Sequence, residues 1–209
     1  MHDVSWIAIV RGTTLMQVQK GIILRKRDEG RLTILDEQLG KIVCSIKRDD
    51  VCIGAYVHYV SEKRHITSFV RTLEQLEAPF ALAREDIVFV HHLLEICDTS
   101  LLSGMVLPSL IPFFLYVYEL GKACVFTSTM KKIIALKLLV YLGLYPDDME
   151  LSCDMIHYYM NTPIDTLLQE NIKLHNSYDL NYWLYECIKS NLDSNCFKTI
   201  HFLKVNEQI

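Results

Sequence analysis

The chain has 209 residues, a hydrophobic share of 51% and a charged share of 22%, a composition typical of a globular protein with one large domain or two small ones. Its 8 glycines and 5 prolines are too few for a collagen-like chain or for a Pro/Gly-rich disordered one. The formal net charge of −4 excludes a protein that coats nucleic acid by bulk positive charge.

The charge is unevenly distributed along the chain. Residues 1–78 carry 12 Lys and Arg against 10 Asp and Glu, a balance of +2, whereas residues 79–209 carry 9 against 15, a balance of −6. We therefore expect two domains with different partners, one over 1–78 that includes an extra N-terminal segment at 1–19, and one over 79–209.

Cysteine usage and apolar runs indicate the compartment. The seven cysteines include no C-x-x-C pair, which favours reduced thiols over a disulfide framework. Residues 1–3 lack the cationic character that begins a signal peptide, and the apolar run 105–120 contains Pro108 and Pro112, which favours a buried helix over a membrane span. The expectation is a cytoplasmic protein with no membrane partner.

Short β-rich runs separated by turn signals occupy residues 20–76. The runs predict five strands, at 21–25, 31–36, 41–47, 51–60 and 65–70. Five short strands with hairpin-length connections suit a small closed barrel, which hides its strand edges.

Helical periodicity replaces strand periodicity after Pro79. Helices are expected at 84–102, 110–120 and 130–142, ended in turn by Gly104, Gly121 and Gly143, with Ser128 or Thr129 capping the third. Four more are expected after residue 146, the last two at 178–191 and 195–205. The predicted fold class is α+β, a five-stranded barrel followed by an all-α helical bundle.

No pattern in the sequence indicates catalysis. The chain contains no Gly-rich phosphate loop, no G-x-S-x-G and no H-E-x-x-H. Cys153 and His157 have helical spacing, but no second pair is placed to complete a zinc site. We expect no enzyme activity, no cofactor and no metal.

Three stretches together resemble one family, the bacterial recombination mediator RecO. Residues 20–30 followed by 38–42 are similar to its opening, residues 137–146 followed by Leu151 and Cys153 to its helical-domain signature, and 182–203 to its last two helices. The resemblance spans residues 20–205, and its specificity comes from the order of the motifs.

The resemblance implies an N-terminal OB-fold joined to a helical domain with no catalytic site. It further implies a role in DNA repair and recombination. RecO proteins bind single- and double-stranded DNA, anneal complementary strands, and act with RecR to help RecA displace the single-strand-binding protein SSB. The acidic C-terminal tail of SSB docks on their helical domain.

Basic residues in the barrel are the candidate DNA ligands, because phosphate contacts supply most non-specific affinity. Strand alternation would place Arg25 and Arg27 on one face. Tyr56 and Tyr59 have a spacing of three, so at most one of them faces a groove and can stack on bases, while the other belongs to the core. The candidates are Arg25, Lys26, Arg27, Arg31, Lys41, Lys47, Arg48, Lys63, Arg64 and Tyr56.

Lys131 and Lys132 lie in the first turn of the third expected helix, where cations oppose the helix dipole. A basic pair beside an apolar helix suits an acidic tail peptide, and the resemblance puts the residue that binds the SSB tail here. The other interpretation is two exposed lysines.

A second function stays open. Asp28, Glu29, Asp49 and Asp50 lie among the barrel cations, and the loop at 47–50 carries two acids beside two bases. These acids and the net charge of −4 favour an adaptor that binds only protein, with an OB-fold that has lost DNA binding.

Overall fold

The computed structural model describes residues 18–28, 30–47, 50–64, 67–144, 158 and 161–169. Within these ranges, five strands come first and helices follow, which confirms the predicted α+β order. The elements are β1 (Gln19–Arg27), β2 (Arg31–Asp36), β3 (Gly40–Ser45), β4 (Tyr56–Arg64), β5 (Thr67–Glu77), the 3-10 turn η1 (Pro79–Ala81), α1 (Arg84–Ser100), α2 (Leu110–Ala123), α3 (Ser128–Leu142) and α5 (Ile164–Gln169). Most of residues 1–19 and the helices expected at 178–191 and 195–205 lie outside the described ranges.

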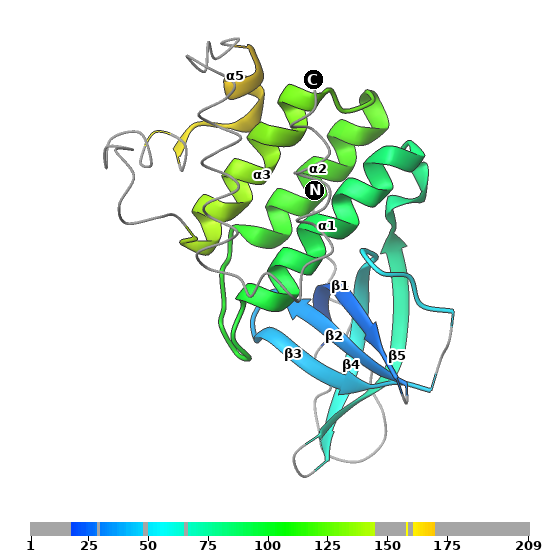
Figure 1. The fold of residues 1–209 in the computed structure, drawn as a ribbon. Coiled ribbons are helices and arrows are strands. Elements are labelled where there is room, and N and C mark those ends of the chain that lie inside the picture. The colour runs from blue at the N-terminus through cyan, green and yellow to red at the C-terminus, as the bar shows by residue number, and fades with distance from the viewer. Residues whose placement is uncertain are drawn as a thin grey trace, which may run out of the picture. The chain divides into compact units, whose positions relative to one another are not determined.

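The five strands form a closed barrel in the order β1-β2-β3-β5-β4 (Figure 1). Neighbouring strands are antiparallel except β3 and β5, which pair in parallel through Cys44 with Ser68 and Ser45 with Phe69. The barrel closes where Gln19 to Ile22 of β1 pair with Tyr59 to Tyr56 of β4. This arrangement is OB-like.

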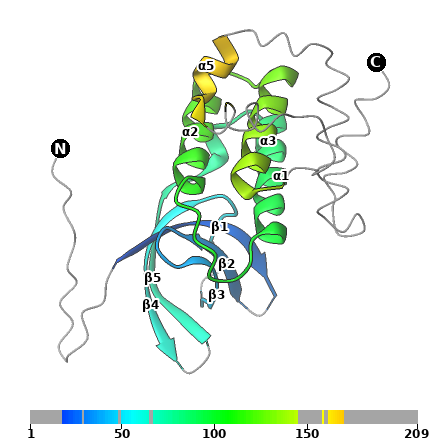
Figure 2. The ribbon, with the colours of Figure 1, turned by 90° about the vertical axis from the view of Figure 1, so that its left-hand side faces the viewer.

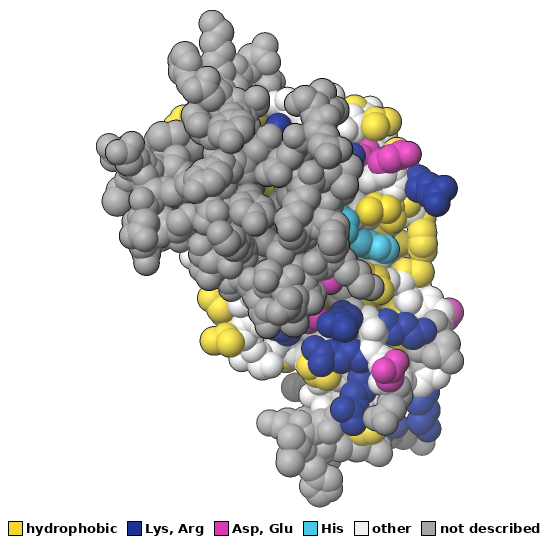
Figure 3. All heavy atoms as spheres, viewed as in Figure 1, with side chains coloured by type: hydrophobic (Ala, Val, Ile, Leu, Met, Phe, Trp, Pro, Cys, Tyr) yellow, Lys and Arg dark blue, Asp and Glu magenta, His cyan; other side chains and the backbone are white. Residues whose placement is uncertain are grey.

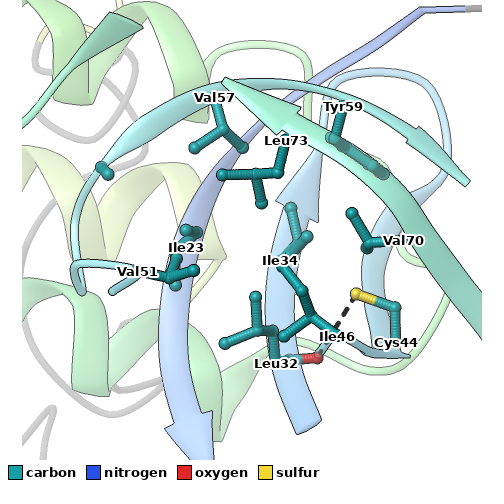
Figure 4. Close-up of a cluster of buried hydrophobic side chains, with 11 residues drawn as sticks. Ile23, Leu32, Ile34, Cys44, Ile46, Val51, Val57, Tyr59, Val70 and Leu73 are labelled. Atoms are coloured by element: carbon teal, nitrogen blue, oxygen red, sulfur yellow. Dashed lines mark hydrogen bonds between the residues drawn. The ribbon is translucent and has the colours of Figure 1, made fainter. Parts of the chain in front are cut away.

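Residues from every strand, together with Ile46, Val51 and Ala55 between β3 and β4, fill the barrel interior (Figure 4). The largest of them is Tyr59, whose hydroxyl donates to Asp36 Oδ2 at 2.5 Å; the expectation that one of the two tyrosines is core is confirmed for Tyr59. Burial raises the pKa of the Cys44 thiol to about 12, so this thiol stays protonated. The interior residues are Ile23, Leu32, Ile34, Cys44, Ile46, Val51, Ala55, Val57, Tyr59, Val70 and Leu73.

The last two strands differ from their predicted bounds. Residues 51–55 were expected to start the fourth strand, but they form a turn at Gly54 (φ +82°) while Val51 and Ala55 still reach the core. Residues 61–64 were expected to be a turn because they are polar, but they extend β4 and pair with β5. Figure 2 shows this hairpin arm reaching past the other strands. Backbone pairing does not require apolar side chains, and the Arg71–Glu62 ion pair ties the arm across the two strands.

Residues 101–109, which follow α1, return to the barrel, and we call them the returning segment. Lys41 is buried on β3, and its Nζ donates to the Leu101 carbonyl at 3.0 Å. Ser103 forms a parallel bridge with Lys41, whose carbonyl accepts from Gly104 N at 2.9 Å. One compact unit therefore comprises the chain up to Ala81 together with Leu101–Leu115, and the other comprises Leu82–Ser100 with the chain from Tyr116 onward. The sequence analysis placed a single division at 78/79, between the expected barrel and the expected helical domain.

In the second unit, α3 contacts both α1 and α5. Lys137 of α3 is buried and its ammonium donates to the Thr162 carbonyl, and burial lowers the pKa of this lysine. No helix among the described residues has the length and apolarity that crossing a membrane requires.

Two helix boundaries in this unit correct the sequence prediction. The N-cap of α3 is Thr127, rather than Ser128 or Thr129, and its side chain accepts from Met130 N. Gly121 does not end α2 but lies inside it, where an added Cβ would stand 2.4 Å from Leu82 Cδ2. This glycine serves close packing instead of helix termination.

The close approach of Gly40 to the returning segment can be tested by substitution. It has φ +69°, and an added Cβ would lie 2.2 Å from the Met105 carbonyl oxygen, a backbone atom that cannot swing aside. Gly104 has φ +79° but open space around its Cβ position. We expect Gly104→Ala to cost only the left-handed conformation, about 1 kcal/mol, and Gly40→Ala to cost distinctly more in urea unfolding. Equal losses for the two variants would contradict this close approach.

Candidate nucleic-acid interface

The end of β1 and the start of β2 bring three arginines onto the outer face of the barrel. Arg25 pairs with Thr33 and Arg27 pairs with Arg31, and the intervening Leu32 points into the core. Arg25, Arg27 and Arg31 therefore share the outer face, as alternation predicted for the first two. All three side chains are exposed.

A hydrogen bond orients this group. Arg27 Nε donates to Thr33 Oγ1 at 3.0 Å, which lays the arginine over the buried threonine. A guanidinium has five donors in a planar arrangement, and this bond fixes the position of the Arg27 group on the outer face. Thr33 has no charge, and sequence reasoning gave it no role; its signal was only its place in the alternation between Leu32 and Ile34.

The segment that follows β3 adds Lys47 beside these arginines. Ser45 pairs with Arg31, and Ile46 N donates to the Gly30 carbonyl at 2.7 Å, so Lys47 follows directly at the β1–β2 turn. We call Arg25, Lys26, Arg27, Arg31 and Lys47 the basic end. All five are exposed, and within residues 25–28, 30–31 and 45–47 the one acid is Asp28.

Figure 3 shows Lys and Arg side chains gathering over the barrel strands with acidic side chains among them. The β1–β2 and β2–β3 ladders, with the Ile46–Gly30 hydrogen bond, bring the cations of 25–27, 31 and 47 to one place. At this end the local balance is positive although the whole chain carries −4.

The register also relates the end of β4 to this region. Lys63 and Arg64 pair with Ser68 and Thr67 of β5, and Ser68 pairs in turn with Cys44 of β3. Lys63 is connected to Lys26 through four successive strand pairings around the closed barrel, by way of Ser68, Cys44 and Leu32, so the register does not place it at the basic end. The side chains of Lys63 and Arg64, and Arg48 as a whole, lie outside the described part of the chain.

Lys41 is not part of the basic end. Its Nζ is buried against the Leu101 carbonyl, so this ammonium serves the docking of the returning segment. A buried donor with its acceptor in place cannot also reach a phosphate on the surface.

Tyr56 is likewise not brought to the basic end. Its strand partners are Ile22 and Glu77, and its ring lies edge-on to His58 at 6.2 Å. Burial raises the pKa of the Tyr56 hydroxyl, and the nearby Glu37 carboxylate raises it further. Acidic neighbours make this tyrosine a poor place for a polyanion.

The two lysines of α3 have different surroundings. Lys131 Nζ lies 2.9 Å from Oδ1 of Asp86, which is fully buried on α1, and 5.9 Å from the Phe89 ring centroid. Asp86 Oδ2 accepts from Phe126 N at 3.0 Å, whereas Oδ1 has no hydrogen bond of good angle within the described chain and depends on the ammonium charge. Lys131 is thus engaged inside the helical unit, and Lys132 beside it is partly buried.

The structure reveals one aromatic residue that sequence reasoning missed. Phe69 pairs with both Ser45 and Glu62, and it is partly exposed on the outer face. Because Phe69 directly precedes Val70, strand alternation could have placed it on the face away from Val70. The parallel β3–β5 pairing that brings it near Arg31 is not visible in the sequence.

Comparison with known proteins adds no assignment to this geometry. Neither the models of protein families nor the curated proteins give a match for this chain.

The Asp86–Lys131 pair generates a stability prediction. We expect Lys131→Met to lower the free energy of unfolding by about 3 kcal/mol, because it leaves a buried carboxylate uncompensated. The matched control Lys132→Met removes the same charge one residue away and should change stability by less than about 0.5 kcal/mol. Both are measured by urea denaturation.

A double-mutant cycle separates the ion pair from simple packing. Adding Asp86→Asn to Lys131→Met should cost less than the sum of the single variants, because an amide tolerates the loss of the ammonium and can still accept from Phe126 N. Additive losses would mean that the pair contributes no coupling.

Proposed function

We propose that this chain binds nucleic acid through the basic end of its OB-like barrel, as a non-enzymatic, RecO-like mediator of DNA repair and recombination. The observation that supports the proposal most is the register that gathers Arg25, Arg27 and Arg31 on one outer face beside Lys47. OB-folds bind oligonucleotides through the face of strands 2 and 3 and through the loops that join strands 1 to 2 and 4 to 5. The basic end occupies the first of these loops and the adjoining face.

Affinity in this proposal comes from phosphate contacts. Each cation that neutralises a phosphate releases counterions, so binding weakens steeply with salt and depends little on sequence. Guanidinium groups suit this role because their planar donor set can contact two phosphate oxygens at once. Phosphates are present in both single strands and duplexes, so one surface can hold two complementary strands and promote annealing.

The wider RecO-like role belongs to the same proposal and derives from the sequence resemblance. It comprises binding of RecR, capture of the SSB tail, and help in loading RecA on SSB-coated DNA. Because Lys131 is paired with Asp86, we assign tail binding to Lys132 alone among the two lysines.

An adaptor that binds only protein is the second candidate. Two of the cations expected to bind partners, Lys41 and Lys131, are committed to internal contacts. The returning segment also exposes apolar side chains, among them Leu102 at 75% and Val106 at 40%. Capture of an SSB tail peptide by a protein that binds no oligonucleotide at low salt would favour the adaptor.

Fluorescence anisotropy with a labelled single-stranded oligonucleotide tests DNA binding. We expect the slope of log affinity against log salt to become shallower by about 1.4 in the Arg27→Ala, Arg31→Ala double variant, since two phosphate contacts are lost at about 0.7 each. Affinity at low salt should fall in parallel.

The control for this experiment is Arg84→Ala, which removes an exposed arginine from the first turn of α1. It should leave both affinity and salt slope unchanged. Absence of salt-sensitive binding by the unaltered protein, or an equal effect of all arginine variants, would contradict DNA binding at the basic end.

A further inference from the structure

The orientation of Phe69 follows from its neighbours along and across the sheet. Val70 and Cys44 both point into the barrel core (Figure 4). Phe69 precedes Val70, and its partner Ser45 follows Cys44, so Phe69 and Ser45 point to the outer face. The ring is partly exposed there.

Phe69 and Arg31 flank the same small residue. Ser45 of β3 pairs with Arg31 on one side and with Phe69 on the other, which separates the backbones of Arg31 and Phe69 by about 10 Å. The serine between them is short, whereas the arginine and the phenylalanine are long. The outer face thus carries a cationic side chain, a short serine and an aromatic ring in one cross-strand row.

Strand β5, which carries Phe69, is paired with a neighbouring strand on both sides. Phe69 pairs with Ser45 in parallel and with Glu62 antiparallel, and Glu62 forms an ion pair with Arg71. A strand that is paired on both sides has a fixed backbone, so little backbone freedom is lost when a ligand stacks on a ring that it carries.

We propose that Phe69 is a base-stacking residue that gives the basic end a preference for single-stranded over duplex nucleic acid, an inference that rests on the proposed function. A phosphate held by Arg31 or Arg27 places its own base toward the ring across Ser45. In a duplex the bases are stacked on one another and paired, so only the phosphates remain accessible to this row. A single strand offers both groups, and every base has a face that can stack.

Anisotropy with three probes of equal phosphate count tests this inference: an oligothymidylate, an abasic strand and a duplex. The unaltered protein should bind the oligothymidylate most tightly. Phe69→Leu should weaken oligothymidylate binding about tenfold and leave the abasic strand and the duplex unchanged. The control Phe80→Leu makes the same change at an aromatic residue of η1 that is 69% exposed, and it should alter none of the three affinities.

A second variant covers the case in which Phe69→Leu disturbs the barrel. Phe69→Trp keeps an aromatic surface, so it should retain the preference for the oligothymidylate, and its added emission should be quenched by that probe and not by the abasic strand.

The outcomes distinguish the two proposals. If the protein binds none of the probes, the proposed function fails and this inference fails with it. If it binds the oligothymidylate and the abasic strand equally, or if Phe69→Leu weakens all three probes alike, DNA binding stands and the stacking role of Phe69 is overturned.

Discussion

The parallel pairing of β3 with β5 is the constraint on which the rest of the first unit depends. It consists of two residue pairs, Cys44 with Ser68 and Ser45 with Phe69, and together with the β1–β4 pairs it joins the β1–β2–β3 meander to the β4–β5 hairpin. Without it Val70 would not cover the core beside Cys44. The same two pairs also set the outer face around Ser45 and Phe69, because inward and outward positions alternate along paired strands away from the register shifts in β1 and in β4–β5.

Several lysines of this protein hold the fold together. Lys41 donates to a carbonyl 60 residues away, Lys131 compensates a carboxylate on another helix, and Lys137 is buried against the Thr162 carbonyl. A lysine stem can lie among apolar groups as long as its ammonium finds an acceptor or an opposite charge. The cations exposed at the basic end are mostly arginines, which is the residue suited to bidentate phosphate contacts.

Local patterns in the sequence were enough to predict the five strands, the first three helices and the shared face of Arg25 and Arg27. They were not enough where distant residues decide the outcome. Residues 61–64 pair within a hairpin in spite of their polarity, Gly121 serves packing against Leu82, and the acceptors of Lys41 and the partner of Lys131 lie far along the chain. The gathering of the basic end could be expected for β1 and β2, which a tight turn joins, but not for Phe69.

The return of residues 101–109 to β3 makes the two units interleaved along the chain. During synthesis on the ribosome, the strands emerge first, but the carbonyl that Lys41 needs does not emerge until the whole of α1 has been made. Until then the Lys41 ammonium of the nascent barrel must find its hydrogen bonds in water. The last step in completing the barrel thus belongs to a segment that is encoded after a helix of the other unit.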